Sequence, residues 1–393
     1  MMLELACWLD NILNQDMSEY SVLCFELHMD DKNMYSLNLY SKKHRTSILN
    51  ENKKLTWKIW GGERQYIRLT DEFEEILLWY MDYGKSGKKL KNCLRIDIIW
   101  QDDVKSIVNT DGILDALRER TAKKAYLLEV HPDKSSDIFD SKFGGMPYWV
   151  PDKEYPTDSS GKKLLLIAQI NLDKSPVKEF DLCSGMLQFF GDSEEIFKED
   201  FGGREDMDKY RVIYHETVDY NISREELISL GVPDSTSSEY QGCIMTSKEL
   251  AMDVTQKTIY IGIGDYRFDM ELRNAIKDKF GFDIGDMTYQ DIFEEKGDIV
   301  DEFGTPGNWL LGYPDDLEFY PEYPRNDPRD TNKDLRQYDQ LLFQFDVHYL
   351  DHDYNDYFYD HGGCGIAGFY IRSEDLEKKN FGHILYHWGA CEQ

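Results

Sequence analysis

The sequence contains one pattern of turns and strands twice, and this repetition constrains the fold more than any other feature. In the first copy, a Gly-x-Pro turn at residues 145–147 precedes an apolar strand that closes with Gln169-Ile170-Asn171. A strand rich in aromatic residues follows at residues 185–190 and begins with glycine. Self-similarity of this kind is typical of two related half-structures within one domain.

The second copy repeats these parts in the same order, 167 to 180 residues later in the chain. Its turn is Gly312-Tyr313-Pro314, its strand closes with Gln344-Phe345-Asp346, and its aromatic strand covers residues 365–370. We therefore predict an internally duplicated domain over residues 111–393, with related halves at about 126–190 and 308–388.

Residues 1–105 predict a separate, small α+β domain, because helical and alternating apolar patterns follow one another there. Thr70 is expected to cap a helix that begins at Asp71. The expected elements are a helix at 2–15, a hairpin at 22–39, a second pair of strands at 55–60 and 65–69, the helix from 71, and a strand at 94–100.

The rest of the chain predicts an α+β fold with mostly antiparallel sheets. Besides the repeated strands, we expect helices at 113–125 and 373–379, helix starts at 223–227 and 246–250, and strands at 126–130, 211–215, 258–264 and 381–388. The stretch 312–340 is rich in proline and aspartate, which predicts a long surface loop.

The charge is strongly negative and unevenly distributed. The net charge is −30; residues 1–110 hold 15 Lys and Arg against 17 Asp and Glu, and residues 111–393 hold 30 against 58. Nucleic-acid binding depends on Lys and Arg that neutralise phosphates, so we expect no nucleic-acid partner. A basic protein partner and simple solubility both remain open explanations of the charge.

The sequence predicts a cytoplasmic protein with no membrane span. No apolar run approaches the ~20 residues that a transmembrane helix requires. The first residues lack the basic region of a signal peptide, and the 7 cysteines form no CxxC pair, which fits a reducing compartment. The sequence does not specify an oligomeric state.

The polar residues that close the repeated strands are the best candidates for a binding site. Because side chains alternate along a strand, Gln169 and Asn171 face one side, as do Gln344 and Asp346. The two pairs could converge on one ligand between the halves. Alternatively, each glutamine satisfies buried backbone groups where its strand enters a loop. The candidate binding residues are Gln169, Asn171, Gln188, Gln344, Asp346 and Asp360.

The segment 348–364 holds the densest supply of metal ligands, yet we predict no metal or other cofactor. An EF-hand loop from Asp351 would need glycine sixth and glutamate twelfth, where the chain has Asp356 and Gly362. His348 and His352 have the spacing of a helical zinc pair, but the neighbouring residues do not favour a helix.

The familiar catalytic motifs are incomplete, so we predict no catalytic residues. Gly144-Gly145 could offer backbone N–H groups to an anion, although glycines beside a proline more often supply a turn. Gly262-Ile263-Gly264-Asp265 lacks the third glycine of a dinucleotide fingerprint. Cys364 lies near His361 in the sequence, which alone does not make a nucleophile–base pair.

The motifs together resemble the YwqG-like family of uncharacterised bacterial proteins. The resemblance rests on Ser141-Lys142-Phe143-Gly144-Gly145-Met146-Pro147-Tyr148, on the strand ends described above, and on Gly368-Phe369-Tyr370-Ile371. It covers residues 111–389 and departs from the family where Asp-Leu-Glu-Phe-Tyr-Pro follows Gly312-Tyr313-Pro314. It implies an α+β, largely antiparallel fold and no established activity.

These observations favour a non-enzymatic binding protein whose acidic domain meets a basic protein partner, for example in an immunity-type role. The alternative is a metal-assisted hydrolase or a small-ligand enzyme with its site between the halves. It would use Asp346, Asp351, Asp353 and Asp360 together with Gln169 and Gln344. A small-molecule sensor with its ligand between the halves is a third possibility.

Overall fold

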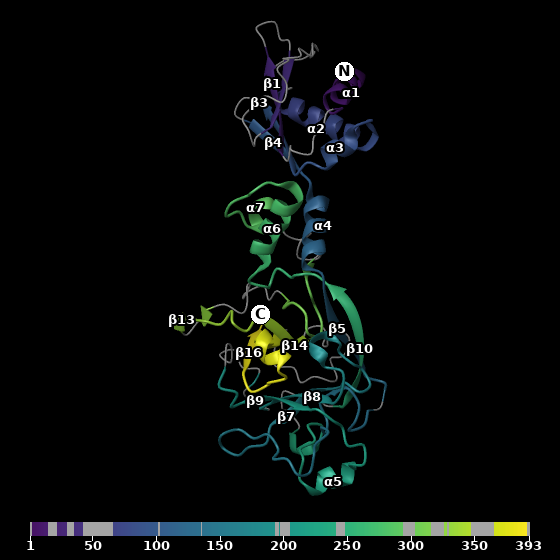
Figure 1. Ribbon diagram of the computed structural model, residues 1–393, viewed down its shortest axis with the longest axis vertical. Helices are drawn as coiled ribbons and strands as arrows, with labels where there is room; N and C mark the ends of the chain where they lie inside the picture. The colour runs from purple at the N-terminus through teal and green to yellow at the C-terminus, as the bar shows by residue number, and fades with distance from the viewer. Residues whose placement is uncertain are drawn as a thin grey trace. The chain divides into compact units, whose positions relative to one another are not determined.

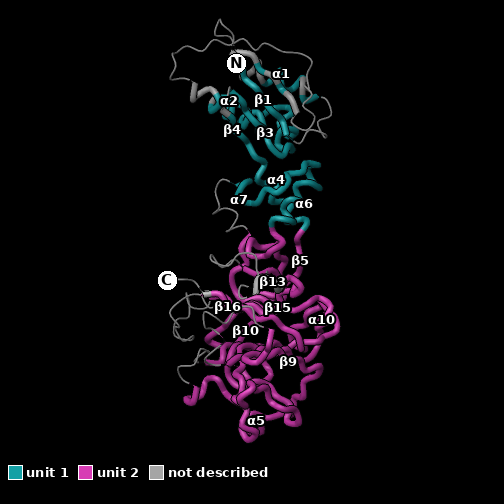
Figure 2. Tube along the Cα trace, turned by 90° about the vertical axis from the view of Figure 1, so that its left-hand side faces the viewer, with its two compact units in different colours: residues 1–120, 269–294 teal, residues 121–268, 295–393 magenta. Residues whose placement is uncertain are grey.

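A computed structural model of the protein shows two compact units (Figures 1 and 2). One consists of Met1–Arg120 with Asp269–Glu294, and the other of Thr121–Phe268 with Glu295–Gln393. The boundaries predicted near residues 105 and 111 remain a prediction. The structure describes residues 2–14, 22–29, 35–41, 66–100, 103–134, 136–192, 196, 205–240, 248–293, 303–315, 326–327, 330–346 and 365–390.

The first unit contains a four-stranded sheet in the order β2-β1-β3-β4. β1 pairs antiparallel with β2 and parallel with β3, and β3 pairs antiparallel with β4. Its elements are α1 (Met2–Ile12), β1 (Val22–Met29), β2 (Tyr35–Ser41), α2 (Tyr66–Tyr83), α3 (Gly87–Lys91), β3 (Arg95–Trp100), β4 (Asp103–Val108), α4 (Thr110–Thr121), α6 (Phe268–Phe280) and α7 (Tyr289–Ile292).

The core of this unit joins the amphipathic helices to one face of the sheet. Trp8 and Leu9 of α1, Phe73 and Leu77 of α2, and Phe25 of β1 are all buried in it. α2 begins at Tyr66, so the strand expected at 65–69 is wrong. In the sequence, Tyr66 and Leu69 precede Phe73 at helical spacing, which is compatible with a helix there. The strand expected at 55–60 lies outside the described residues.

The second unit contains one ten-stranded, antiparallel sheet that curls into a nearly closed barrel. Its order is β16-β15-β14-β11-β5-β10-β6-β7-β8-β9. The strands are β5 (Lys123–His131), β6 (Lys142–Phe143), β7 (Leu165–Asn171), β8 (Met186–Gly191), β9 (Tyr210–His215), β10 (Leu250–Ile259), β11 (Trp309–Leu310), β14 (Gln340–Asp346), β15 (Gly365–Ile371) and β16 (Ile384–Ala390).

Aromatic residues join the two edge strands of this sheet. The Tyr210 hydroxyl of β9 donates to the Ile384 carbonyl of β16 at 2.9 Å, and the Tyr210 and Tyr386 ring centroids are 5.2 Å apart. Phe189, Phe343 and Phe369 fill the interior between the sheet's two ends. The core therefore lies within the curl of the sheet.

Shorter elements connect the strands of the second unit. They are a 3-10 turn at Glu179–Asp181, α5 (Arg224–Ser229), a 3-10 turn at Ser238–Tyr240, a small hairpin of β12 (Asn326–Asp327) and β13 (Asp330–Asp334), and α10 (Ser373–Glu377). Ser223 caps α5 through the Glu226 N–H, as its sequence predicts. The helix start expected at 246–250 is wrong, because Leu250 begins β10. Within the stretch expected to be a loop, β12 and β13 form a hairpin.

The two sequence copies form matching sets of strands. β6 pairs with β7 through Lys142–Gln169, and β11 pairs with β14 through Trp309–Gln344. In each set, a bulge shifts the register with the next strand. The shift lies at Leu166/Ala168 in β7, which pairs with β8, and at Leu341/Phe343 in β14, which pairs with β15. On the other side of each set lies a long strand: β10 pairs with β6, and β5 pairs with β11.

The bulge determines which face the polar strand ends occupy. In β7, Leu166 points away from the barrel interior, whereas Leu165, Ile167 and Ala168 belong to the interior core. The extra residue shifts the alternation by one, so Gln169 lies on the outer face. None of the helices in the described part of the chain has the length and apolar character needed to cross a membrane.

Candidate functional site

Gln169 is fully buried and joins backbone groups on the two sides of β6. Its Nε2 donates to the carbonyl oxygens of Ile138 (2.9 Å) and Asp140 (2.8 Å), and its Oε1 accepts from the Tyr148 N–H (3.0 Å). One amide thus satisfies three backbone groups that would otherwise be buried without partners.

Asn171, two residues further along β7, connects the sheet to the surface. Its backbone N–H donates to the Ser141 hydroxyl (2.9 Å), and its Nδ2 donates to the Phe139 carbonyl (2.7 Å) and to the Tyr220 hydroxyl (3.3 Å). Asn171 itself is buried, whereas Tyr220 is 49% exposed. This contact is the point at which the predicted site residues reach solvent-exposed groups.

Gln188 extends the buried network to the neighbouring strands. Its Nε2 donates to the Tyr148 carbonyl (2.7 Å) and to Gln169 Oε1 (3.2 Å), and its Oε1 lies 3.0 Å from His215 Nε2. In this arrangement an amide oxygen can only accept, so Nε2 is the protonated ring nitrogen. His215 Nδ1 is then an acceptor, and among the described residues nothing donates to it.

His215 is electrically neutral in this environment. Burial, and to a smaller extent the positive charge of Lys153, lower the pKa of its imidazole to about 4. The ring is edge-on to Tyr148 and Trp149, with centroids 5.3 and 5.2 Å away. A neutral imidazole surrounded by aromatic rings acts as a hydrogen-bonding group rather than as a charge.

Gln344 and Asp346 bind their own segment in the other half. Gln344 Nε2 donates to the Thr305 (2.9 Å) and Gly307 (3.0 Å) carbonyls, and its Oε1 accepts from the Asp315 N–H (2.9 Å). Asp346 Oδ2 accepts from the Gly307 N–H at 2.8 Å. Gln169 and Gln344 therefore bind different loops.

The polar positions next to Gln169 do not recur around Gln344. Gln188 faces Gln169 in the sheet, and the residue that faces Gln344 is Gly368. A side chain at Gly368 would meet the Tyr370 ring, whose nearest carbon is 2.5 Å from an added Cβ. The remaining predicted residue, Asp360, lies outside the described residues.

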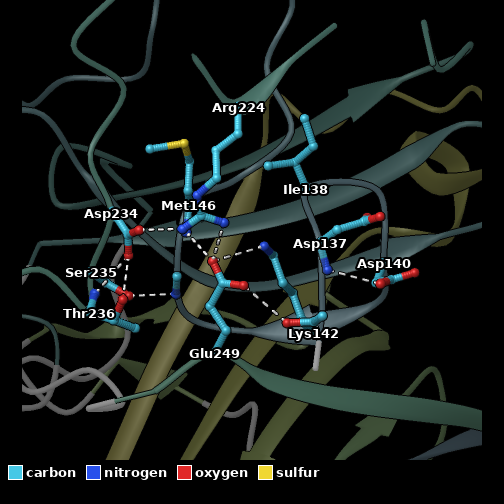
Figure 3. Close-up of polar contacts among 12 residues, drawn as sticks. Asp137, Ile138, Asp140, Lys142, Met146, Arg224, Asp234, Ser235, Thr236 and Glu249 are labelled. Carbon is cyan, nitrogen blue, oxygen red and sulfur yellow. Dashed lines mark hydrogen bonds and ion pairs between the residues drawn. The ribbon is translucent and has the colours of Figure 1, made fainter. Parts of the chain in front are cut away.

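A cluster of charged residues surrounds the Gly-Gly turn of the first half (Figure 3). Glu249 Oε1 accepts from the Met146 N–H (3.1 Å) and from Arg224 (3.0 Å), and Lys142 Nζ lies 3.4 Å from the same oxygen. Glu249 Oε2 accepts from the Ser136 hydroxyl at 3.1 Å. The turn does bind an anion, but that anion is a side chain of the protein itself.

Two further contacts fix the turn and the arginine. The Gly145 N–H donates to the Ser235 hydroxyl at 2.7 Å. Arg224 also donates to Asp234 Oδ2 at 2.6 Å. Gly145 has φ +75°, and a Cβ there would lie 2.0 Å from Glu249 Cγ, so the glutamate packs directly on the backbone of the turn.

Lys142 and Glu249 were not predicted, and the repeat offers the signal that could have identified them. Lys142 is fully buried, and desolvation lowers the pKa of its ammonium although Glu249 opposes the shift. The matching position in the second half is Trp309, which packs on Ala125. A charged residue in one copy where the other copy has tryptophan marks a local difference in chemistry.

The metal-binding segment considered from the sequence, 348–364, lies outside the described residues. In the part of the chain that the structure describes, no three His, Cys, Asp or Glu side chains are grouped so that they could hold a metal ion. His383 Nδ1 lies 3.5 Å from Asp375 Oδ2. The described site is therefore a set of hydrogen bonds and ion pairs around a loop.

Comparison with protein families gives one match. The model described as "Domain of unknown function (DUF1963)" matches residues 141–391. This range contains both copies of the repeated pattern and the whole Glu249 cluster except Ser136. No curated protein matches the chain.

Proposed function

Because the chain belongs to the DUF1963 family of domains of unknown function, we propose its function from its own surface: it is a non-enzymatic binding protein that holds a basic protein partner. The observation that carries this proposal is a fixed, exposed tyrosine surrounded by carboxylates. We call this surface the Tyr220 patch; it consists of Asp137, Asp140, Asp173, Asp219 and Tyr220.

Hydrogen bonds hold Tyr220 in one position at the surface. Its hydroxyl donates to Asp173 Oδ2 (3.0 Å) and accepts from Asn171, and its ring lies 5.1 Å from the Phe139 ring. The Asp219 N–H is bound to the Tyr148 hydroxyl at 2.9 Å. A pre-positioned aromatic residue loses little conformational entropy on binding, which is why tyrosine is frequent among the strongest contacts of interfaces.

The charge of the patch favours a basic partner. Of its four carboxylates, Asp140 pairs with Lys174 at 2.6 Å, so the patch keeps a net negative charge. Residues 111–393 as a whole carry 28 more acidic than basic residues. Such a field attracts a basic partner from a distance, and the tyrosine then supplies contact area.

The test is the affinity of the full-length chain for a short lysine- and arginine-rich peptide, measured by fluorescence anisotropy at 50 and 300 mM salt. We expect Tyr220→Ala to weaken binding about tenfold at both salt concentrations. The matched control is Tyr83→Ala, which removes a tyrosine that is 75% exposed in the first unit and leaves the net charge unchanged. Equal affinities of the two variants would mean that the peptide responds only to overall charge.

We also propose that the second unit arose by duplication of one module whose first strand was exchanged between the copies. Support comes from matching backbone contacts: the Gly144 N–H binds the Ile167 carbonyl and the Leu311 N–H binds the Leu342 carbonyl, both at 2.9 Å. The exchanged strands match as well. The Leu128 N–H binds the Asn308 carbonyl at 2.9 Å, and the Met252 N–H binds the Ser141 carbonyl at 3.1 Å.

We also propose four properties that the sequence predicts. They are the likeness to YwqG-like proteins, a cytoplasmic location, an independent N-terminal domain and an immunity-type role. The last requires a basic partner, so it depends on the Tyr220 patch. Purification of the chain with a bound basic protein, lost in Tyr220→Ala and kept in Tyr83→Ala, is the result that would support it.

A further inference from the structure

The Glu249 cluster has the composition of a carboxylate-binding site. The Met146 N–H, the Arg224 guanidinium and the Lys142 ammonium all face one oxygen of the Glu249 carboxylate, and the Ser136 hydroxyl binds the other. Charged and neutral donors that converge on both oxygens of one carboxylate are the usual means of carboxylate recognition.

The fold does not require a lysine at the position of Lys142. At the matching place in the second half, Trp309 and Ala125 pack with Ile259, and Leu311 and Gly312 form the turn. In the same molecule, the position that matches Lys142 is thus filled by the apolar side chain of Trp309, and the charged groups nearby, Lys123 and Arg267, lie over the Tyr313 ring. Apolar replacement of buried ion pairs is often neutral or stabilising, so the charges of the first half need a reason other than stability.

The Lys142 ammonium retains capacity for another acceptor. Its nitrogen is fully buried, has the ion pair with Glu249 at 3.4 Å, and makes no hydrogen bond within the described residues. An ammonium group has three N–H donors. Buried donors without partners are costly, so this group favours an additional or better-placed oxygen.

The cluster is also open to solvent at one side. The Arg224 side chain is 39% exposed and that of Glu249 is 14% exposed, while Lys142 lies behind them. A carboxylate that enters beside Arg224 would meet the arginine first and the lysine next. Asp234, bound to Arg224 at 2.6 Å, keeps the guanidinium oriented toward the cluster.

We propose that Lys142, Arg224 and the Met146 N–H form a carboxylate-binding site, and that the Glu249 side chain is an internal ligand which an external carboxylate replaces. This site is separate from the Tyr220 patch, and its ligand is an anion rather than a basic protein. An internal competitor raises the apparent Kd for an external ligand, because that Kd is the intrinsic value divided by the fraction of time that the site is free.

The test uses ¹³C-labelled acetate with the full-length chain and follows the line width of the acetate signal at constant ionic strength. We expect saturable broadening with the wild type, about tenfold tighter binding with Glu249→Ala, and no saturable binding with Lys142→Met in either background. The matched control is Glu225→Ala, which removes an exposed glutamate from α5 and should bind as the wild type does.

Two outcomes would overturn the proposal. One is the absence of saturable broadening with the wild type, and the other is equal affinity of the wild type and Glu249→Ala. Glu249→Gln keeps the size of the side chain and provides the same comparison if the alanine variant does not fold. Tyr220→Ala should bind acetate normally, so a failure of this test is distinguishable from a failure of the peptide-binding proposal.

Discussion

The side-chain oxygen of Gln188 lies 3.0 Å from His215 Nε2, and this contact determines where the imidazole carries its proton. Gln188 is oriented by its own donation to the Tyr148 carbonyl and to Gln169. The amide cannot turn over without losing both bonds. His215 is therefore held as the neutral Nε2–H tautomer, and its ring packs against Tyr148 and Trp149.

This arrangement predicts that the protein loses stability in mild acid. The pKa of His215 is about 4 when folded and 6.5 in its unperturbed state, so between these values the unfolded chain binds more protons. The free energy of unfolding should fall by up to ~3 kcal/mol between pH 7 and pH 4 from this group alone. Urea unfolding at several pH values measures the effect.

The matched comparison is between two histidine variants. In His215→Gln the fall between pH 7 and pH 4 should be smaller than in the wild type, because the titrating group is gone. His383 is exposed, and His383→Gln should leave the fall unchanged. An unchanged pH dependence in His215→Gln would contradict the assignment.

Gly145 and Gly161 provide a paired prediction about the turn of the first half. Both have positive φ, +75° and +86°, but a Cβ at Gly145 would lie 2.0 Å from Glu249, whereas a Cβ at Gly161 would have nothing within 4 Å. We expect Gly161→Ala to cost about 1 kcal/mol of unfolding free energy, from backbone strain alone. Gly145→Ala should cost at least ~2 kcal/mol more because it displaces the glutamate.

Urea unfolding of the two variants decides this prediction. Adding Glu249→Ala to Gly145→Ala should recover much of the extra loss, since the obstructing side chain is then absent. Similar losses in Gly145→Ala and Gly161→Ala would show that Glu249 moves aside without cost.

The buried glutamines should differ in their importance for stability. Gln169 binds three backbone groups of its loop, whereas Gln188 binds one carbonyl and two side chains. Gln169→Met leaves three buried backbone groups unsatisfied, so we expect it to cost ~3 kcal/mol or more, and Gln188→Met to cost less. Gln344→Met should behave like Gln169→Met because its three contacts match.

Thermal melting of the three variants under identical conditions tests this order. The decisive comparison is between Gln169→Met and Gln188→Met, which remove the same chemical group from neighbouring strands. A greater loss from Gln188→Met would mean that the contact with His215 matters more than the loop.

The sequence predicted the strands of the repeated pattern because their signals are local. Apolar runs closed by polar residues identify β7 and β14, and glycine-led aromatic runs identify β8 and β15. The bulges that turn Gln169 and Gln344 outward could not be predicted, since an uninterrupted apolar run has no alternation from which to read the offset.

The charged cluster was missed because its members come from distant parts of the chain. Glu249 follows hydroxyl residues, and this local pattern indicates a helix start. In the fold its carboxylate instead binds the Met146 N–H, and β10 begins at the next residue. Burial of Lys142 could not be predicted, because burial of a lysine is a property of the tertiary structure.

A double-mutant cycle between Lys142 and Glu249 is expected to show strong coupling. Glu249→Met leaves the Lys142 ammonium buried without its ion pair, so it should cost about 3–5 kcal/mol of unfolding free energy. Lys142→Met should cost less, because Glu249 keeps its bonds to Arg224 and to the Met146 N–H. The double variant places apolar side chains where the second half has Trp309 and Ala125.

We therefore expect Lys142→Met to be far less harmful in the Glu249→Met background than alone, with a coupling energy of about 2 kcal/mol. Urea unfolding of the four proteins measures this energy. Additive costs would mean that the 3.4 Å contact contributes nothing and that Lys142 is held by other groups. Coupling of the expected size would instead show that the lysine charge is tolerated in the interior because an acidic group occupies the site beside it.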